Sequence, residues 1–178
     1  MAADPINLPV LAREKEAENR EFRLYLKQRC GLDPAQVDAE VFAITKRVWA
    51  AIDCTACANC CKQTRPTLGE EDLDRLARRL RLERRKFIDA YLKPTEEDED
   101  NPWQMAATPC PFLKDNRCHA YEDRPANCRG YPYLYEPDFV FRTIAMLGRT
   151  STCPIVYEVL EELKRSLDFP RPRGKKGR

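Results

Sequence analysis

The chain has 178 residues, the usual length of one domain, and its 43% hydrophobic and 34% charged residues suit a modest core beneath a heavily charged surface. A formal net charge of only +2 produces no overall field that would recruit nucleic acid or an anionic membrane. The first residues lack the basic start and the apolar core of a signal peptide, and no stretch approaches the roughly 20 apolar residues that span a bilayer, so we expect a soluble, cytoplasmic protein.

The N-terminal part of the chain, residues 1–53, is predicted to be a helical segment. A charged helix with a thin apolar stripe is expected from about residue 10 to residue 30. Asp33 followed by Pro34 is typical of a helix start, because an aspartate caps the first turn and a proline fits its first position. Apolar residues then recur at spacings of three and four, which predicts a helix over 34–52 that leads directly into the first cysteines.

Further helices are predicted along the rest of the chain. Thr67 with Glu70 three residues later forms a capping-box pattern, which predicts the start of an amphipathic helix that continues to Leu80. Another helix is expected over 84–92, since a proline soon follows it, and a last one over 154–167 with a proline in its first turn.

The remaining segments are predicted to be irregular. The acidic run 96–100 is most simply a solvated loop, because like charges repel one another and resist packing. Prolines and cysteines interrupt residues 103–135 every few positions, so tight turns and short strands held by metal are expected there. Periodicity leaves 139–147 open between strand and helix.

Eight of the nine cysteines form a constellation between Cys54 and Cys153. Four of them occur as Cys-x2-Cys-x2-Cys-Cys, a spacing that lets the thiolates of a short loop converge on one centre, as in zinc ribbons and ferredoxins. The other four are dispersed, and two of these precede a proline that stiffens the chain. The candidate cofactor and metal ligands are Cys54, Cys57, Cys60, Cys61, Cys110, Cys118, Cys128 and Cys153.

These thiols indicate a metal centre. A reducing cytosol disfavours a disulfide framework, and no βαβ pattern surrounds Cys54 and Cys57 that would indicate a thioredoxin-like role. Simple burial suits a lone cysteine such as Cys30, but not eight cysteines in so short a span. Because His119 is the single histidine, the ligands must be mainly thiolates, which favours zinc or an iron–sulfur cluster over harder cations. Eight thiolates could fill two four-ligand sites, or one site with bystanders.

The order of these motifs carries a family resemblance. The matching residues are Cys54-x2-Cys57-x2-Cys60-Cys61, Cys110-Pro-Phe-Leu, Cys118-His-Ala-Tyr121, Arg124-Pro125, Cys128-Arg129 and Tyr131-Pro132, with Cys153 as a later member. In this order they resemble the YkgJ family of cysteine-cluster proteins, the CxxCxxCC zinc- or iron-chelating domains. One departure is Ala58, where the family often has glycine.

The same signature also resembles the cysteine region of the flagellin lysine methylase, which is associated with an iron–sulfur cluster. That resemblance implies an iron–sulfur cluster over zinc. Three cysteines in a Cys-x2-Cys-x2-Cys run, together with a distant fourth, are a recurrent way to hold a four-iron cluster, so 4Fe-4S is the first choice. The remaining part of the methylase has no counterpart in this chain, so the resemblance does not decide whether the protein is catalytic.

Residues beside the cysteines could carry further chemistry. His119 is interpreted as an exposed histidine in a turn, with a ligand or proton-donor role as the alternative. Arg124 and Arg129 could neutralise thiolate charge or brace turns through backbone carbonyls, and the sequence does not separate the two. Aromatic residues are expected to form a small core that shields the metal, with a stacking surface as the alternative: Trp103, Tyr121, Tyr131, Tyr133 and Tyr135.

The sequence therefore predicts a mainly α fold with irregular, metal-stapled loops, as a small single domain whose helices flank a cysteine-ligated metal site. Its expected parts are the helical segment 1–53, a cysteine-cluster metal-binding domain over 54–168 and a disordered basic tail over 169–178.

The leading functional hypothesis is a metal-binding protein that holds an iron–sulfur cluster or zinc for electron transfer, metal handling or sensing, with an unidentified redox or protein partner. One alternative is an iron–sulfur-dependent, protein-modifying enzyme that resembles the flagellin lysine methylase. The other is a structural zinc module that binds a nucleic acid or a protein. Charge argues against nucleic acid and membrane as partners, and the oligomeric state stays open.

Overall fold

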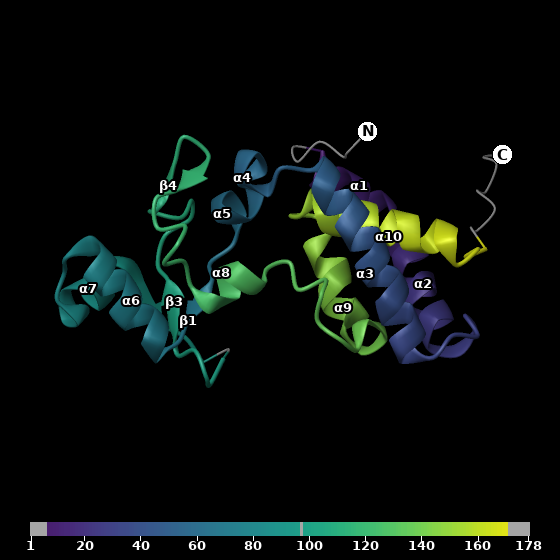
Figure 1. Ribbon diagram of the computed structural model, residues 1–178, viewed down its shortest axis with the longest axis horizontal. Helices are drawn as coiled ribbons and strands as arrows, with labels where there is room; N and C mark the ends of the chain where they lie inside the picture. The colour runs from purple at the N-terminus through teal and green to yellow at the C-terminus, as the bar shows by residue number, and fades with distance from the viewer. Residues whose placement is uncertain (1–6, 97, 171–178) are drawn as a thin grey trace. The chain divides into compact units, whose positions relative to one another are not determined.

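The computed structural model describes residues 7–96 and 98–170, and it divides the chain into two compact units (Figure 1). The helical unit joins the segment that ends at Asp53 to the segment that begins at Pro132. The cysteine unit is the continuous segment Cys54–Tyr131. None of the helices in the described residues combines the length and the apolar character needed to cross a bilayer.

The helical unit consists of helices packed around one apolar core. Its elements are α1 (Leu8–Glu14), α2 (Glu16–Gln28), α3 (Pro34–Ala51), α9 (Phe139–Arg149) and α10 (Pro154–Ser166). Helix α3 packs against both α10 and α9, and α2 packs against α9 (Figure 1). The helices predicted over 34–52 and 154–167 are confirmed, and the predicted first helix is interrupted at Lys15, which separates α1 from α2.

Local sequence signals account for the start of α3 and for the helical conformation of α9. The Asp33 carboxylate accepts a 2.8 Å hydrogen bond from the Gln36 N–H, and the Gln36 side chain accepts one of 3.0 Å from the Asp33 N–H. This reciprocal pair completes the predicted cap. The segment 139–147 is helical, because Phe139, Thr143 and Met146 then lie on one face and are buried together.

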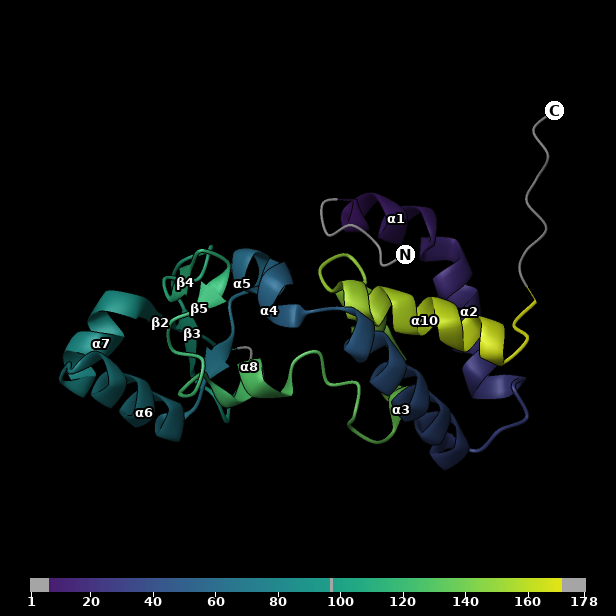
Figure 2. The same ribbon diagram turned by 45° about the horizontal axis from the view of Figure 1, so that its top comes forward.

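The cysteine unit combines short helices with two small antiparallel sheets. Its elements are α4 (Cys54–Cys57), α5 (Asn59–Gln63), β1 (Thr67–Leu68), α6 (Glu70–Leu80), α7 (Arg84–Tyr91), β2 (Leu92–Pro94), β3 (Trp103–Met105), β4 (Leu113–Lys114), β5 (Arg117–Cys118) and α8 (Ala126–Gly130). Strand β3 lies between β1 and β2, and β4 pairs with β5 as a hairpin. Helices α6 and α7 form a helical hairpin (Figure 2).

The core of the cysteine unit supports the segments that carry its cysteines. Buried apolar residues from α6, α7, β1, β3 and the segment before β4 form one cluster: Leu68, Leu73, Leu76, Phe87, Met105 and Phe112. Cys110 and Cys118 are partly buried and pack against this cluster. The predicted helix over 84–92 is confirmed as α7, and it ends where the chain enters β2.

One predicted helix start is wrong. Helix α6 begins at Glu70 with Gly69 as its N-cap, and no side chain caps it. Thr67 lies instead in β1, and its hydroxyl donates a 3.0 Å hydrogen bond to Asp98 of the acidic run. Asp98 also accepts hydrogen bonds from Asn101, so this run is anchored at one position while its neighbours in the described residues remain exposed.

The predicted mainly helical fold is thus confirmed. The predicted segment 54–168 is shared between the two units, because the chain returns to the N-terminal helices after Tyr131. The last part of the predicted basic tail, residues 171–178, lies outside the described residues.

Candidate metal centre

The candidate ligands are divided between the two units. Cys153 lies in the helical unit, where it is buried at the N-cap of α10 and its N–H donates a 2.8 Å hydrogen bond to the Arg149 carbonyl. Cys30 is in the same unit, and its thiol donates to the Leu26 carbonyl at 3.2 Å. The other seven cysteines all belong to the cysteine unit. No disulfide joins any of the nine cysteines, all of which lie in described parts of the chain.

The first group of cysteines is carried by two very short helices. Cys54 and Cys57 are the first and last residues of α4, and Cys60 and Cys61 lie in α5. Ala58 joins the two helices with a φ of 49°, in the left-handed region, and its side chain is buried. Residues other than glycine adopt this conformation at an energetic cost, which accounts for the glycine expected here from the family resemblance.

A main-chain hydrogen bond links the first cysteine group to the second. The N–H of Cys110 donates to the carbonyl of Cys61 at 2.8 Å, and the carbonyl of Cys110 accepts from the N–H of Leu113 at 3.0 Å. Leu113 begins the β4–β5 hairpin, in which it pairs with Cys118. Helix α4 also packs against β5. The backbone therefore brings the first cysteine group, Cys110 and Cys118 together.

The turn of the β4–β5 hairpin has a local signal in the sequence. Asp115 and Asn116 connect β4 to β5, with φ values of 51° and 59°. A two-residue hairpin loop of type I′ needs positive φ at both positions, and aspartate and asparagine tolerate it better than most residues. The Asp-Asn pair ahead of Cys118 could thus have predicted this hairpin.

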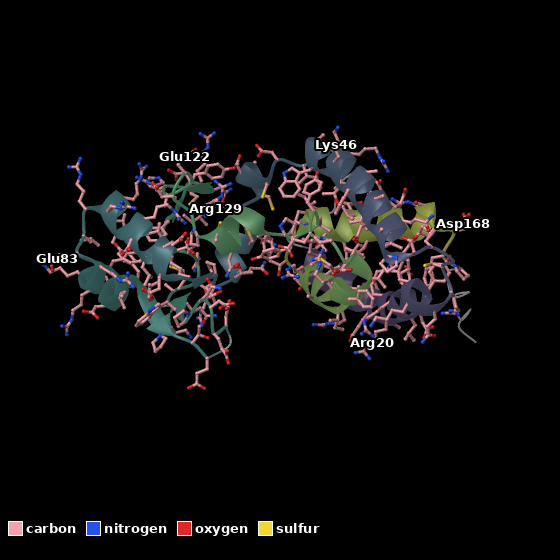
Figure 3. The ribbon with its side chains drawn as sticks, turned by 60° about the horizontal axis from the view of Figure 1, so that its bottom comes forward. Arg20, Lys46, Glu83, Glu122, Arg129 and Asp168 are labelled. Atoms are coloured by element: carbon pink, nitrogen blue, oxygen red, sulfur yellow. The ribbon has the colours of Figure 1, made fainter. Side chains whose placement is uncertain are left out.

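Cys128 is positioned by hydrogen bonds on both sides of it. The Asn127 side chain donates to the carbonyl of Thr67, at 3.3 Å, and to its hydroxyl. The guanidinium of Arg129, labelled on α8 in Figure 3, donates to the carbonyl of Arg124 at 2.8 Å. These contacts fix α8 against β1 and against the preceding loop.

Sulfurs in the cysteine unit interact electrostatically with one another. Burial raises the pKa of the Cys128 thiol to about 12, and negative charge on Cys61, Cys110 and Cys118 raises it further. Burial also raises the pKa values of Cys110 and Cys118, and charge on Cys61 acts in the same direction on both. We refer to Cys61, Cys110, Cys118 and Cys128 as the four-thiol set.

Cys61 differs from the other members of the four-thiol set. A hydrogen bond with the Cys60 side chain lowers its pKa to about 7, although burial opposes this shift. Near neutral pH the Cys61 sulfur therefore carries negative charge before the other three do, and a thiolate is the form that binds metal.

Arg124 combines the two roles that the sequence left open. Its guanidinium donates a 2.6 Å hydrogen bond to the Tyr121 carbonyl and lies 3.8 Å from the centroid of the Tyr121 ring. Its positive charge also acts on Cys118, where it partly offsets the effect of burial on the pKa. Arg124 thus braces the turn and supplies a countercharge beside the thiols.

His119 is an exposed residue of a turn, as expected. Its backbone N–H donates to the Phe112 carbonyl at 2.8 Å, and its own carbonyl accepts from Arg79 at 3.2 Å. These contacts fix the main chain directly after Cys118.

The predicted aromatic core around the metal is divided between the units. Tyr121 and Tyr131 belong to the cysteine unit, and Trp103 packs against its core. Tyr133 and Tyr135 belong to the helical unit, where Tyr135 packs against the rings of Phe42 and Trp49 with centroid distances of 5.8 and 6.1 Å. Tyr133 faces the guanidinium of Arg149 at 4.8 Å.

The thiols of the cysteine unit suit zinc or iron in their chemistry, but in the described part of the chain they do not lie close enough together to hold an ion. Partly buried thiols coupled to one another provide the soft ligands that both metals take in tetrathiolate sites. Within residues 7–96 and 98–170, however, no three cysteine, histidine, aspartate or glutamate side chains meet closely enough to hold one ion. Metal binding would displace the protons of these thiols, because the thiolate is the form that binds.

Comparison with protein families shows which family the cysteine motifs belong to. The family model CxxCxxCC, described as "Putative zinc- or iron-chelating domain", matches residues 53–154, which is more than half of the chain. The matched span includes all eight candidate ligands and leaves out Cys30. No curated protein and no solved structure gives a significant match.

Proposed function

Because the chain belongs to the CxxCxxCC family of zinc- or iron-chelating domains, we propose that its cysteine unit holds a metal centre through the four-thiol set. The family supports a metal-binding role. Negative charge on Cys61 raises the pKa of each of the other three thiols, in addition to the larger effect of burial, which supports a grouping of these four sulfurs. The main-chain hydrogen bond from Cys110 to Cys61 adds support from geometry.

The proposed cofactor is an iron–sulfur cluster, with 4Fe-4S as the first choice and zinc as the second. Thiolate-only ligation is common to both. The resemblance to the cysteine region of the flagellin lysine methylase favours the cluster. A cluster supplies one-electron redox chemistry, whereas zinc in a tetrathiolate site chiefly stabilises the fold.

The proposed role is that of an accessory metalloprotein for electron transfer, metal handling or sensing. All four members of the four-thiol set are only partly buried, so the centre would lie near the surface of its unit. A shallow centre is accessible to a partner that exchanges electrons or metal with it. Arg124 and the exposed Tyr121 ring beside Cys118 provide a polar and aromatic contact surface for such a partner.

Cys54, Cys57 and Cys60 stay predicted ligands of the same or of a second centre. They lie on α4 and α5, directly before Cys61, and α4 packs against the strand that carries Cys118. The number of metal equivalents per chain distinguishes one centre from two.

Metal and acid-labile sulfide analysis tests the proposal, on full-length protein purified without oxygen and accompanied by a visible spectrum. About four irons and four sulfides per chain, with absorption bleached by dithionite, would identify a 4Fe-4S cluster. About one zinc without sulfide would identify a tetrathiolate zinc site. Protein with reduced thiols that contains neither metal, and takes up neither when supplied with it, would refute the proposal.

A further inference from the structure

We infer that Asp72 and Arg75 of α6 are positioning residues of the metal centre, because they fix the loop 123–126, which contains the countercharge Arg124 and leads into the helix that carries Cys128. The inference rests on the proposed function and extends it to residues outside the cysteine motifs. Neither residue stood out in the sequence, where both fit an ordinary charged helix.

Asp72 is a buried carboxylate directed at the start of α8. Its side chain is 5% exposed, and its two oxygens lie 3.1 and 3.2 Å from the backbone nitrogen of Ala126, whose N–H they accept. Ala126 is the first residue of α8, and Cys128 follows two positions later. A buried carboxylate is costly unless it is paired and hydrogen-bonded, and Asp72 is both, since Arg75 forms an ion pair with it.

Arg75 holds the other end of the same loop. Its guanidinium donates to the carbonyl of Asp123 at 3.2 Å and to the carbonyl of Arg124 at 3.1 Å, while it remains paired with Asp72. The Arg124 carbonyl also accepts from Arg129. A planar guanidinium can make these several contacts at once, which a lysine cannot.

Helix α6 gives this pair a fixed base. Leu73 and Leu76 are fully buried in the core of the cysteine unit, directly next to Asp72 and Arg75 in the sequence. The pair therefore links residues 123–126 to the packed core by hydrogen bonds. Figure 3 shows the side chains of this unit around α8, where Arg129 is labelled.

The loop matters to the centre at two points. It leads directly into α8, which carries Cys128, and it contains Arg124, whose guanidinium donates a hydrogen bond to the Tyr121 carbonyl three residues after Cys118. If this loop were free to move, one ligand and one countercharge would be lost together. Residues that orient metal ligands typically contribute roughly 10- to 100-fold to metal affinity.

The sign of the change in zinc affinity when Asp72 is replaced distinguishes a positioning role from a purely electrostatic one. The negative charge of Asp72 disfavours the thiolate of Cys128. Removing that charge would thus strengthen metal binding if charge were the only contribution of Asp72. A positioning role predicts the opposite, weaker binding, when Asp72 is replaced by asparagine.

The test measures the zinc affinity of the full chain by competition with a chromophoric chelator, together with the cobalt(II) absorption spectrum. Asp72→Asn should weaken zinc binding roughly 10- to 100-fold and alter the cobalt spectrum. The matched control is Asp74→Asn, which removes the same charge from an exposed position of α6 that pairs with Arg84 instead. Asp74→Asn should leave both measurements unchanged.

A second variant, Arg75→Lys, tests the other member of the pair. Arg75→Lys retains the positive charge but loses the forked contacts with the loop, so it should also weaken zinc binding while circular dichroism remains as in the wild type. Equal or tighter zinc binding by Asp72→Asn would overturn the inference. So would unfolding of both variants, because the pair would then serve the fold alone. Failure of the wild-type protein to bind metal would refute the proposed function itself.

Discussion

The N–H of Cys110 donates a 2.8 Å hydrogen bond to the carbonyl of Cys61, which joins two cysteine motifs that lie far apart in the sequence. This contact places the fourth cysteine of the CxxCxxCC run beside Cys110. It supports the inclusion of both Cys61 and Cys110 in the proposed ligand set.

The first prediction concerns the ligands themselves. Cys128→Ala should weaken zinc binding by roughly 100-fold or more, because a structural zinc site is worth about 10–16 kcal/mol and one of its four ligands is lost. Cys61→Ala should have a comparable effect. Chelator competition on the purified variants measures both.

Cys30→Ala is the matched control for these variants. Its thiol donates to a carbonyl of its own helix in the helical unit, so its removal should leave metal content and affinity unchanged. If Cys30→Ala removed the metal and Cys128→Ala retained it, the proposed division of the cysteines would be wrong.

The second prediction concerns protons that metal binding releases. The pKa values of Cys110, Cys118 and Cys128 are raised, so these thiols are protonated at neutral pH, whereas Cys61 is partly ionised. Zinc binding to all four should release about three protons between pH 7 and 9, and the apparent affinity should rise by about three orders of magnitude per pH unit. Titration in buffers with different ionisation enthalpies counts the protons. A release of fewer than about two would exclude this ligand set.

These examples also show what the sequence could predict and what it could not. The predicted cap at Asp33 is confirmed, because Asp33 and its partner Gln36 lie only three residues apart in the sequence. The same kind of pattern at Thr67 and Glu70 failed, because pairing between β1 and β3 and the hydrogen bond to Asp98 hold Thr67 outside the helix. Tertiary contacts override local propensity in such cases.

For the candidate site too, local patterns in the sequence were informative and contacts between distant segments were not predictable. The order of the motifs predicts eight cysteines as ligands, and the family model spans all eight. Their grouping depends on contacts between distant segments, such as the hydrogen bond between Cys110 and Cys61, which no spacing reveals. Asp72 could not be recognised at all, because only the folded loop shows that it binds the N–H of Ala126.

The third prediction concerns the stability of the metal-free protein at different pH values. The pKa of Cys128 is about 12 when folded, against an ordinary value of 9.0, so the folded chain binds this proton more tightly. The contribution of Cys128 to stability is therefore complete below about pH 9 and is lost as the pH rises towards 12. The pKa of Cys61 is lowered to about 7, so its contribution is present above about pH 9 and is lost as the pH falls through 7.

Urea unfolding of the metal-free protein across this range measures the effect. Lysine and tyrosine residues titrate in the same range, so the Cys128→Ala variant serves as the reference. The wild-type protein should lose more stability than Cys128→Ala between about pH 9 and 11. Parallel losses in the two proteins would show that Cys128 does not titrate as proposed.

The last prediction concerns Ala58, which joins α4 to α5 with a φ of 49°. A left-handed conformation costs an alanine about 1–2 kcal/mol relative to glycine, because the Cβ atom approaches the following carbonyl. Ala58→Gly relieves this cost, but it also removes a buried methyl group and gives the unfolded chain more freedom. Ala77→Gly incurs the same two penalties, because Ala77 is as buried as Ala58. Ala77 lies in the interior of α6 with a helical backbone, so its replacement relieves no left-handed strain. Urea unfolding should therefore find Ala58→Gly more stable than Ala77→Gly by about 1–2 kcal/mol. Equal destabilisation by the two variants would show that the turn between α4 and α5 does not hold Ala58 in the left-handed region.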